Sequence, residues 1–207
     1  GALNCSARNN NISVTNCEIG YIGGVLSDIC VVQAMNGLLK KGAKYMIDDL
    51  KKEKASKKTI IYAPHHSYNR SIHIGTFDKL GKQVLEFAKK HREFNWVFKP
   101  HPDLKEVLYG DIRFGKKFAD KYYQEWADLG QSYEKGNYFD LFMNSDLLIT
   151  DCDAFLLEYM PTGSPIIRLE RKNGTKLSEL GQEIVQGMYR TKNFDDFRNI
   201  FEELMVT

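Results

Sequence analysis

The segment from Ser145 to Leu169 constrains the fold of this chain more than any other part of it. Leu147–Ile149 is a short apolar run that predicts a buried β-strand, and Pro165–Ile167 opens a second strand. Between them, Thr150–Asp153 predicts a polar turn, which leads into a short helix that ends at Pro161–Gly163. This order is typical of a parallel sheet. Such sheets bind ligands at the carboxyl ends of their strands, so the polar turn is the first candidate for function.

The rest of the chain repeats this alternation of strands and helices. Apolar, β-branched runs predict strands at Thr59–Ala63 and Asn95–Phe98, and a proline follows shortly after each run. Helices are predicted over residues 76–91, 104–136, 138–144, 177–188 and 194–205. The alternation predicts an α/β fold: a Rossmann-like parallel sheet of roughly four or five strands with helices on both faces.

The first part of the chain has a different pattern. Residues 1–24 are polar, rich in asparagine and punctuated by glycine, and residues 26–54 carry apolar side chains at helical spacing. We therefore predict that residues 1–57 form an interdomain linker and packing helix. Residues 58–207 are then predicted to form one Rossmann-like nucleotide-binding domain.

The composition excludes several classes of protein. The 29 Lys and Arg residues nearly balance the 27 Asp and Glu residues, which argues against a nucleic-acid-binding protein. The four cysteines match no zinc-binding spacing and the carboxylates form no cluster, so no metal is predicted, although Asp151 and Asp153 could touch a cation. The cysteine usage and the absence of a signal peptide or a long apolar run predict a cytoplasmic protein.

Polar clusters follow three of the predicted strands. They are His65–Ser67, Lys99–His101 and Thr150–Asp153. Because all strands of a parallel sheet point the same way, the segments that follow them meet at one edge of the sheet. The sequence therefore predicts that these clusters lie close together and form the functional site.

The residue types in these clusters suit a ligand that carries phosphate. Lys99 supplies a point charge, and His101 can donate to a phosphate oxygen or act as an acid or base. The helix predicted over residues 154–160 offers main-chain N–H groups to an anion, and Glu158 could hold a ribose. Ser67 beside two histidines would also suit a hydrolase, but no nucleophile-elbow glycine pattern accompanies it.

Three motifs resemble those of a known family. They are IIYAPHHS at 60–67, WVFKPHPDLK at 96–105 and SDLLITDCDAFLLEYMPTGSPIIRL at 145–169. In this order they resemble the CDP-glycerol glycerophosphotransferase family, over about Lys58 to Leu169. The resemblance implies the GT-B arrangement of two Rossmann-like domains, in which the carboxyl-terminal domain holds the donor nucleotide. It also implies a role in the synthesis of teichoic-acid-like or capsular polymers at the cell envelope.

The resemblance also implies roles for individual residues. The implied catalytic residues are His101, His65 and His66, and the implied nucleotide-binding residues are Pro64, Ser67, Lys99, Thr150, Asp151, Asp153, Ala154, Phe155 and Glu158. The chain departs from the family at Asp153 and Ala154, where the family usually has serine. An aspartate there would compete with a phosphate for the N–H groups of the helix. This predicts that the chain binds CDP weakly, or that its ligand is a different nucleotide or a nucleotide bridged by a cation.

The implied substrate is a CDP-type donor such as CDP-glycerol, and no cofactor is required. The implied partners are an N-terminal acceptor domain outside this sequence and a polymer or lipid acceptor. The full-length protein would then be cytoplasmic or peripheral on the inner face of the membrane, and this chain alone is expected to bind nucleotide weakly without turnover. Two alternatives stay open: a nucleotide-sugar glycosyltransferase or epimerase of the GT-B fold, and a degenerate, non-catalytic donor domain.

Overall fold

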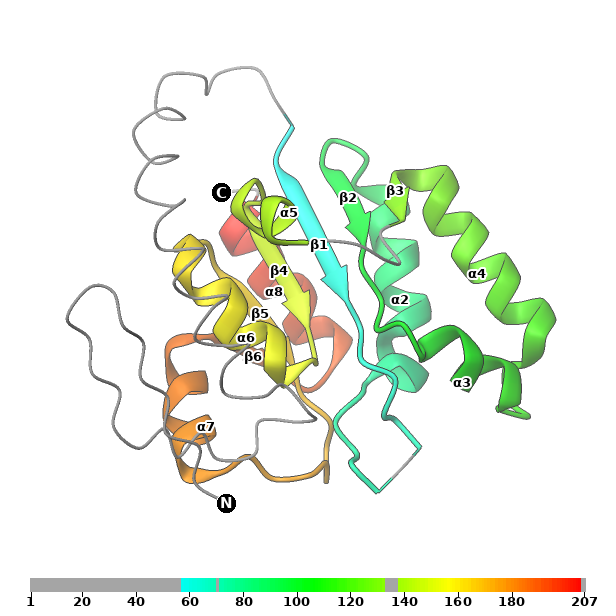
Figure 1. The fold of residues 1–207 in the computed structure, drawn as a ribbon. Helices are drawn as coiled ribbons and strands as arrows, with labels where there is room; N and C mark the ends of the chain where they lie inside the picture. Colours follow the sequence, from blue (N-terminus) through cyan, green and yellow to red (C-terminus); the bar gives the residue numbers. More distant parts are fainter. Residues whose placement is uncertain (1–56, 70, 133–137, 206–207) are drawn as a thin grey trace, which may run out of the picture.

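The computed structural model describes residues 57–69, 71–132 and 138–205. These residues form a parallel six-stranded sheet in the order β3-β2-β1-β4-β5-β6 (Figure 1). The strands are β1 (Thr59–Ala63), β2 (Asn95–Phe98), β3 (Gln131–Ser132), β4 (Leu147–Thr150), β5 (Ile166–Leu169) and β6 (Tyr189–Thr191). The predicted α/β fold with a Rossmann-like parallel sheet is thus confirmed. The sheet has more strands than predicted because it includes the short strands β3 and β6. Runs of two or three residues are too short to show the alternation by which a strand is recognised in a sequence.

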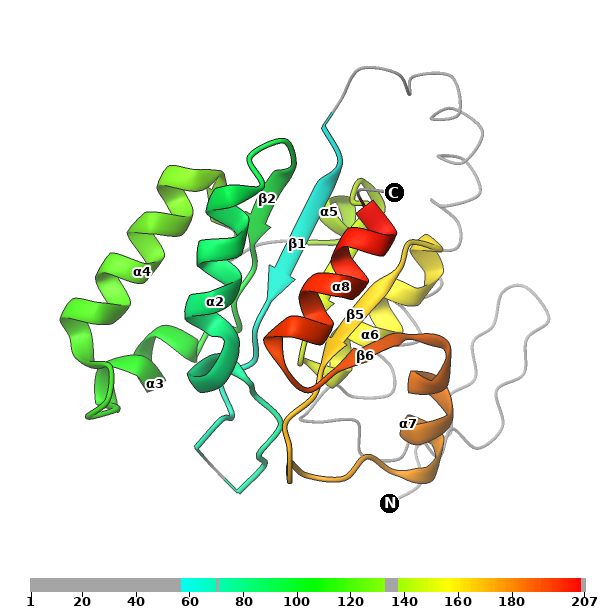
Figure 2. The ribbon, with the colours of Figure 1, turned by 180° about the vertical axis from the view of Figure 1, so that it is seen from behind.

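Helices cover both faces of the sheet, as predicted. The helical elements are α2 (Phe77–Lys90), α3 (Leu104–Gly110), α4 (Gly115–Leu129), α5 (Phe139–Met143), α6 (Asp153–Tyr159), η1 (Met160–Thr162), α7 (Glu179–Ile184), η2 (Val185–Gly187) and α8 (Phe194–Met205). Helices α2, α4 and α8 lie over one face (Figure 2), and α5 and α6 lie over the other (Figure 1). None of the helices in the described ranges is both long and apolar enough to span a bilayer.

Alternation along β1 divides the core between the two faces. Ile60 and Tyr62 join the apolar cluster beneath α2, α4 and α8, whereas Ile61 and Ala63 join the cluster beneath α5 and α6. All four side chains are buried, which is typical of a central strand in a sheet covered on both sides. The sheet core therefore holds the carboxyl end of β1 rigidly.

Aromatic side chains on one face of α4 pack into the core. Tyr122, Tyr123 and Trp126 are buried, and the ring of Trp126 stacks on that of Phe98 in β2 with centroids 5.0 Å apart. Stacked aromatic pairs of this kind add to the stabilisation from burial alone. This face of α4 is thus used for packing.

Two predicted helices are shorter than expected. The helix predicted over 104–136 is divided into α3 and α4 by a turn that ends at Gly115, whose φ of 72° suits glycine. Helix α4 then ends at Leu129, and the next residue, Gly130, lies so close to Trp96 that a Cβ atom would be 2.3 Å from the Trp96 carbonyl oxygen. The helix predicted over 177–188 is replaced by α7, η2 and the approach to β6.

The predicted linker and packing helix (residues 1–57) lie outside the described residues except for Lys57. The predicted domain boundary therefore stays a prediction.

The order of the strands sets the position of a binding crevice. From β1 the chain proceeds through β2 to β3 at one edge, and it then returns to β4 on the other side of β1. The segments that follow β1 and β4 therefore diverge above the sheet. Open α/β sheets bind ligands at such a switch point.

Candidate functional site

Three histidine rings meet at this switch point. His65 and His66 follow β1, and His101 follows β2. The ring centroids are 4.3 Å apart for His65 and His66, 4.7 Å for His65 and His101, and 4.0 Å for His66 and His101. The main-chain N–H of His101 also donates to the carbonyl oxygen of Pro64 at 2.9 Å. The predicted convergence of these two clusters is therefore confirmed.

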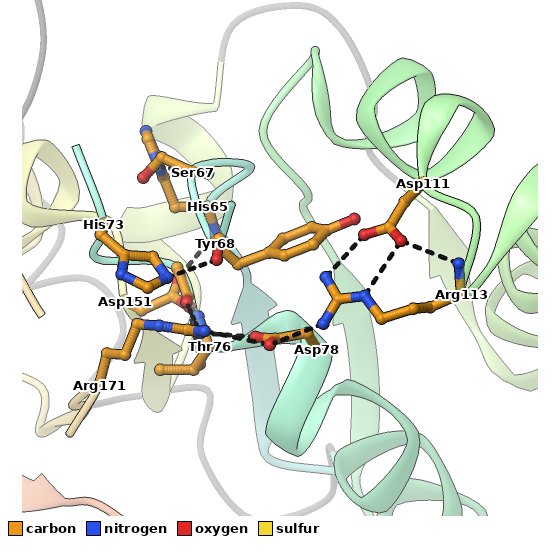
Figure 3. Close-up of polar contacts among 11 residues, drawn as sticks. His65, Ser67, Tyr68, His73, Thr76, Asp78, Asp111, Arg113, Asp151 and Arg171 are labelled. Atoms are coloured by element: carbon orange, nitrogen blue, oxygen red, sulfur yellow. Dashed lines mark hydrogen bonds and ion pairs between the residues drawn. The ribbon is translucent and has the colours of Figure 1, made fainter. Parts of the chain in front are cut away.

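Asp151 joins the third cluster to the first. Its carboxylate accepts a hydrogen bond of 2.5 Å from the main-chain N–H of His65. It also accepts from both the main-chain N–H and the hydroxyl of Thr76, which precedes α2 (Figure 3). Burial raises the pKa of Asp151 to about 6, and the hydrogen bonds from Thr76 and His65 oppose this rise. Asp151 thus holds both ends of the segment between β1 and α2, a positioning role that the sequence does not reveal.

His65 and His101 are held as neutral rings. Burial lowers the pKa of His65 to about 3, and the neighbouring His66 and His101 lower it further. Burial likewise lowers the pKa of His101 to about 4, with a further contribution from His66. The Nδ1 atom of His65 accepts from the N–H of Ser67 at 3.2 Å, and that of His101 accepts from the N–H of Asp103 at 3.1 Å. A neutral ring that accepts at Nδ1 carries its proton on Nε2.

Ser67 is a poor candidate for a nucleophile despite its neighbour. Its hydroxyl oxygen lies 2.8 Å from Nδ1 of His65, the distance expected between a nucleophile and its base. The side chain is buried, with an exposed fraction of 2%. Its hydroxyl orients His65 instead of facing solvent.

Lys99 places a buried positive charge beside the histidines. Its residue exposure is 4%, and its ammonium group lies 5.0 Å from the ring centroid of Tyr138 and 5.4 Å from that of Phe155. Burial lowers the pKa of Lys99, which Cys152 and Glu158 oppose. Lys99 forms no salt bridge with the residues that the structure describes. A buried ammonium group balanced mainly by ring faces favours an anionic ligand.

The remaining predicted residues have internal partners or line the same region. Glu158 is buried and accepts from the Tyr138 hydroxyl at 2.7 Å. The Thr150 hydroxyl donates to the Ala63 carbonyl at 2.6 Å and so ties β4 to β1. Pro64 is buried, and Ala154 and Phe155 are partly exposed at the start of α6. The predicted contacts of these residues with a nucleotide stay predictions.

Asp153 does not compete for the N–H groups of α6, contrary to the expectation from the sequence. Its carboxylate accepts from Nη2 of Arg168 at 2.9 Å and from Nε at 3.3 Å. Both side chains are buried, and Arg168 also pairs with Glu170 at 2.7 Å. The aspartate is therefore turned toward β5, which leaves the start of α6 to other partners.

The sequence reasoning missed a basic cavity of about 560 Å³ beyond the ends of β5 and β6. Its charged lining consists of Arg168, Glu170, Arg171, Lys176, Arg190 and Lys192. Arg171 also donates to the carbonyl oxygen of Gly75 at 2.7 Å and to Asp78 at 2.6 Å, which fixes the segment before α2 (Figure 3). The basic residues are spread over two strand ends, so only the parallel pairing of β5 and β6 brings them together.

Comparisons with known proteins give a family and a fold. A family model described as CDP-Glycerol:Poly(glycerophosphate) glycerophosphotransferase matches residues 39–171. A search of curated protein sequences found no match.

Several solved structures are similar. The UDP-GlcNAc 2-epimerase of Methanocaldococcus jannaschii, in complex with UDP-GlcNAc and UDP, matches 86% of this chain at 16% identity with a TM-score of 0.56. The UDP-GlcNAc 2-epimerase of Neisseria meningitidis, bound to UDP-GlcNAc, matches 84% at 15% identity with a TM-score of 0.48. This chain covers 46% and 44% of these two proteins, less than half of each. At 16% identity, the likeness to the Methanocaldococcus jannaschii enzyme shows the fold alone.

Proposed function

The chain belongs to the CDP-glycerol:poly(glycerophosphate) glycerophosphotransferase family, and on that premise we propose that it is the donor-binding domain of a transferase with the GT-B arrangement. The proposed donor is a nucleoside diphosphate carrying glycerol phosphate, with CDP-glycerol as the first candidate. In this proposal the chain is the donor-binding one of the two Rossmann-like domains of that arrangement. The acceptor, a polymer or lipid of the cell envelope, would meet the other domain.

The observation that carries this proposal is the position of Lys99. It is a buried cation at the carboxyl end of β2, two residues before His101, and its ammonium group lies over the rings of Tyr138 and Phe155. A diphosphate is the ligand that such a site accommodates, because it supplies the negative charge that the described residues leave unpaired. The Nε2–H groups of His65 and His101 would donate to its oxygens.

The chemistry follows from these positions. The acceptor hydroxyl oxygen forms a bond to the β-phosphorus of the donor, the bond from this phosphorus to the bridging oxygen breaks, and the nucleoside monophosphate leaves. The hydroxyl proton passes to an imidazole, for which His66 is the first candidate, because the neutral rings of His65 and His101 carry their protons on Nε2 and accept at Nδ1. Lys99 would stabilise the charge that develops on the phosphoryl oxygens.

The test is calorimetric titration of the 207-residue chain with CDP, UDP and CDP-glycerol. Lys99→Met keeps the apolar stem but removes the charge, so we expect about a tenfold loss of affinity, or about 1.4 kcal/mol. Lys82→Met is the matched control. Lys82 also lies over an aromatic ring, that of Phe118, but Lys82 is on α2, away from the site. Equal affinity in Lys99→Met and Lys82→Met would contradict the proposal, as would no binding of any nucleotide by a longer protein that includes the acceptor domain.

A second candidate is a nucleotide-sugar transferase or epimerase that uses a UDP-linked donor. It is favoured by the fold shared with the Methanocaldococcus jannaschii epimerase, whose structure holds UDP-GlcNAc and UDP. Tighter binding of UDP than of CDP in the same titration would select it. Tighter binding of CDP-glycerol than of CDP would exclude it, because the glycerol phosphate would then have its own contacts.

A further inference from the structure

We propose that His65, His66 and His101 form a binding site for a divalent transition-metal ion, with Zn²⁺ as the expected occupant. One ring nitrogen from each histidine lies within 4.8 Å of the other two. An all-imidazole ligand set suits zinc, copper, nickel or cobalt and disfavours magnesium and calcium, which prefer oxygen. The sequence predicts no metal, because the three ligands come from two segments that meet only in the folded sheet.

The geometry requires only a small contraction. Tetrahedral zinc with bonds of about 2.1 Å to nitrogen places its ligand atoms about 3.4 Å apart. The widest pair must therefore move closer by about 1.4 Å, which ring rotation can supply. His66 and His101 are only partly buried, whereas His65 is buried and is held by Asp151 through its main chain.

Two neighbouring side chains are placed to orient the ligands. Ser67 Oγ lies 2.8 Å from Nδ1 of His65, and Asp103 Oδ2 lies 4.0 Å from Nδ1 of His101. Coordination through Nε2 requires a proton on Nδ1, which needs an acceptor of this kind. Metal binding would thus shift both rings to the other tautomer. The hydroxyl and the carboxylate would then replace the main-chain N–H groups that donate to Nδ1 in the metal-free rings.

The site is open to a fourth ligand. Three protein ligands leave one position of tetrahedral zinc vacant, as in catalytic zinc sites. Lys99 lies beside the histidines, so an anion at this position would touch both the metal and the ammonium group. That this anion is a donor phosphate oxygen depends on the proposed function, whereas the metal site itself does not.

The experiment uses the full 207-residue chain, freed of metal by a chelator and dialysed. Zinc is titrated by calorimetry, and cobalt(II) is titrated by visible absorption, which reports tetrahedral coordination. We expect one Zn²⁺ to bind with a dissociation constant below about 10 µM, that is, a free energy below about −7 kcal/mol. His66→Ala and His101→Ala should each lower the affinity more than about 100-fold, and Ser67→Ala about 10-fold, the range for orienting residues.

Controls separate this site from other metal ligands. His91→Ala should leave zinc affinity unchanged, because His91 lies beside Glu93 at the end of α2, before β2, and thus at the opposite edge of the sheet from His101, which follows β2. Cys5, Cys17 and Cys30 lie outside the described residues, and zinc bound there would survive both His66→Ala and His101→Ala. Zinc affinity that these two variants leave unchanged, or no zinc binding below about 100 µM, would overturn the proposal.

A parallel titration keeps this inference apart from the proposed function. CDP and CDP-glycerol are titrated once with chelator and once with Zn²⁺. Zinc binding without any nucleotide binding would support the metal site and count against the donor site. If nucleotide binds in the presence of chelator, and zinc does not bind when the chelator is removed, the metal site alone would be overturned.

Discussion

The carboxylate of Asp151, at the end of β4, binds Thr76 through both its main-chain N–H and its hydroxyl group (Figure 3). The same carboxylate accepts from the N–H of His65 at 2.5 Å. One buried side chain thus joins three segments at the switch point: the end of β4, the residues after β1 and the start of α2. The positions of the histidines depend on this contact.

We expect Asp151→Asn to unfold more readily than the native chain. The amide keeps one acceptor oxygen but turns an NH₂ group toward main-chain and hydroxyl donors, leaving buried donors unsatisfied at about 1–3 kcal/mol. Urea unfolding followed by circular dichroism measures the change. Asp128→Asn, on the exposed side of α4, is the control and should shift stability by less than about 0.5 kcal/mol. Equal stability of the two variants would show that Asp151 does not brace the site.

The ion pair of Asp111 and Arg113 should make stability depend on acidic pH. Arg113 donates to Asp111 at 2.7 and 3.0 Å and holds its pKa at about 2, below the usual 3.8. The pKa of Asp111 is lower in the folded state than in the unfolded state. The pair therefore stabilises the fold above about pH 4, and this contribution is lost as pH falls toward about 2.

Arg113→Met should therefore flatten the pH dependence of the urea midpoint between about pH 4 and 2. Arg198→Met removes an exposed pair at 3.6 Å and should leave this dependence as in the native chain. A native-like slope in Arg113→Met would contradict the assignment.

Asp153→Ser restores the residue type usual in the family and tests the role of this position. Because the carboxylate faces Arg168 and not the N–H groups of α6, we expect CDP affinity to change by less than about twofold. The buried guanidinium keeps Glu170 as a partner, so the loss of stability should stay near about 1–2 kcal/mol. A tenfold gain in CDP affinity would show instead that Asp153 blocks the phosphate.

Arg168→Met should lower the stability of the fold more than Asp153→Ser does. It leaves the carboxylate of Asp153 buried without its partner, at about 3–5 kcal/mol. Thermal unfolding of the two single variants and of the double variant Asp153→Ser/Arg168→Met measures the coupling. The double variant should be more stable than Arg168→Met alone, and the opposite order would contradict a pairwise interaction.

Gly130→Ala tests the close approach between Trp96 and the residue that follows α4. The added Cβ would lie 2.3 Å from the carbonyl oxygen of Trp96, so the start of β3 must move, at about 1–3 kcal/mol. Gly110→Ala is the matched control, because a Cβ there meets nothing within 4 Å at the end of α3. We expect it to be neutral or to stabilise by up to about 1 kcal/mol. Urea midpoints of both variants give the comparison.

The sequence alone determined the elements whose pattern is local. Alternation along Thr59–Ala63 and the helical spacing after Thr76 depend only on neighbouring residues, and the structure confirms β1 and α2 there. The meeting of His65 with His101 also followed from sequence, because parallel strands must place the segments after them at one edge.

Only the tertiary structure decided which partner each buried charge takes. Asp151 lies 75 residues from Thr76 in sequence, and Arg168 meets Asp153 only because β5 pairs with β4. No local pattern encodes such pairs, since a carboxylate at a strand end can face a ligand, a helix N-terminus or another strand with equal local cost. Burial removes that freedom: a charge deprived of water must take the partner that the fold brings within reach.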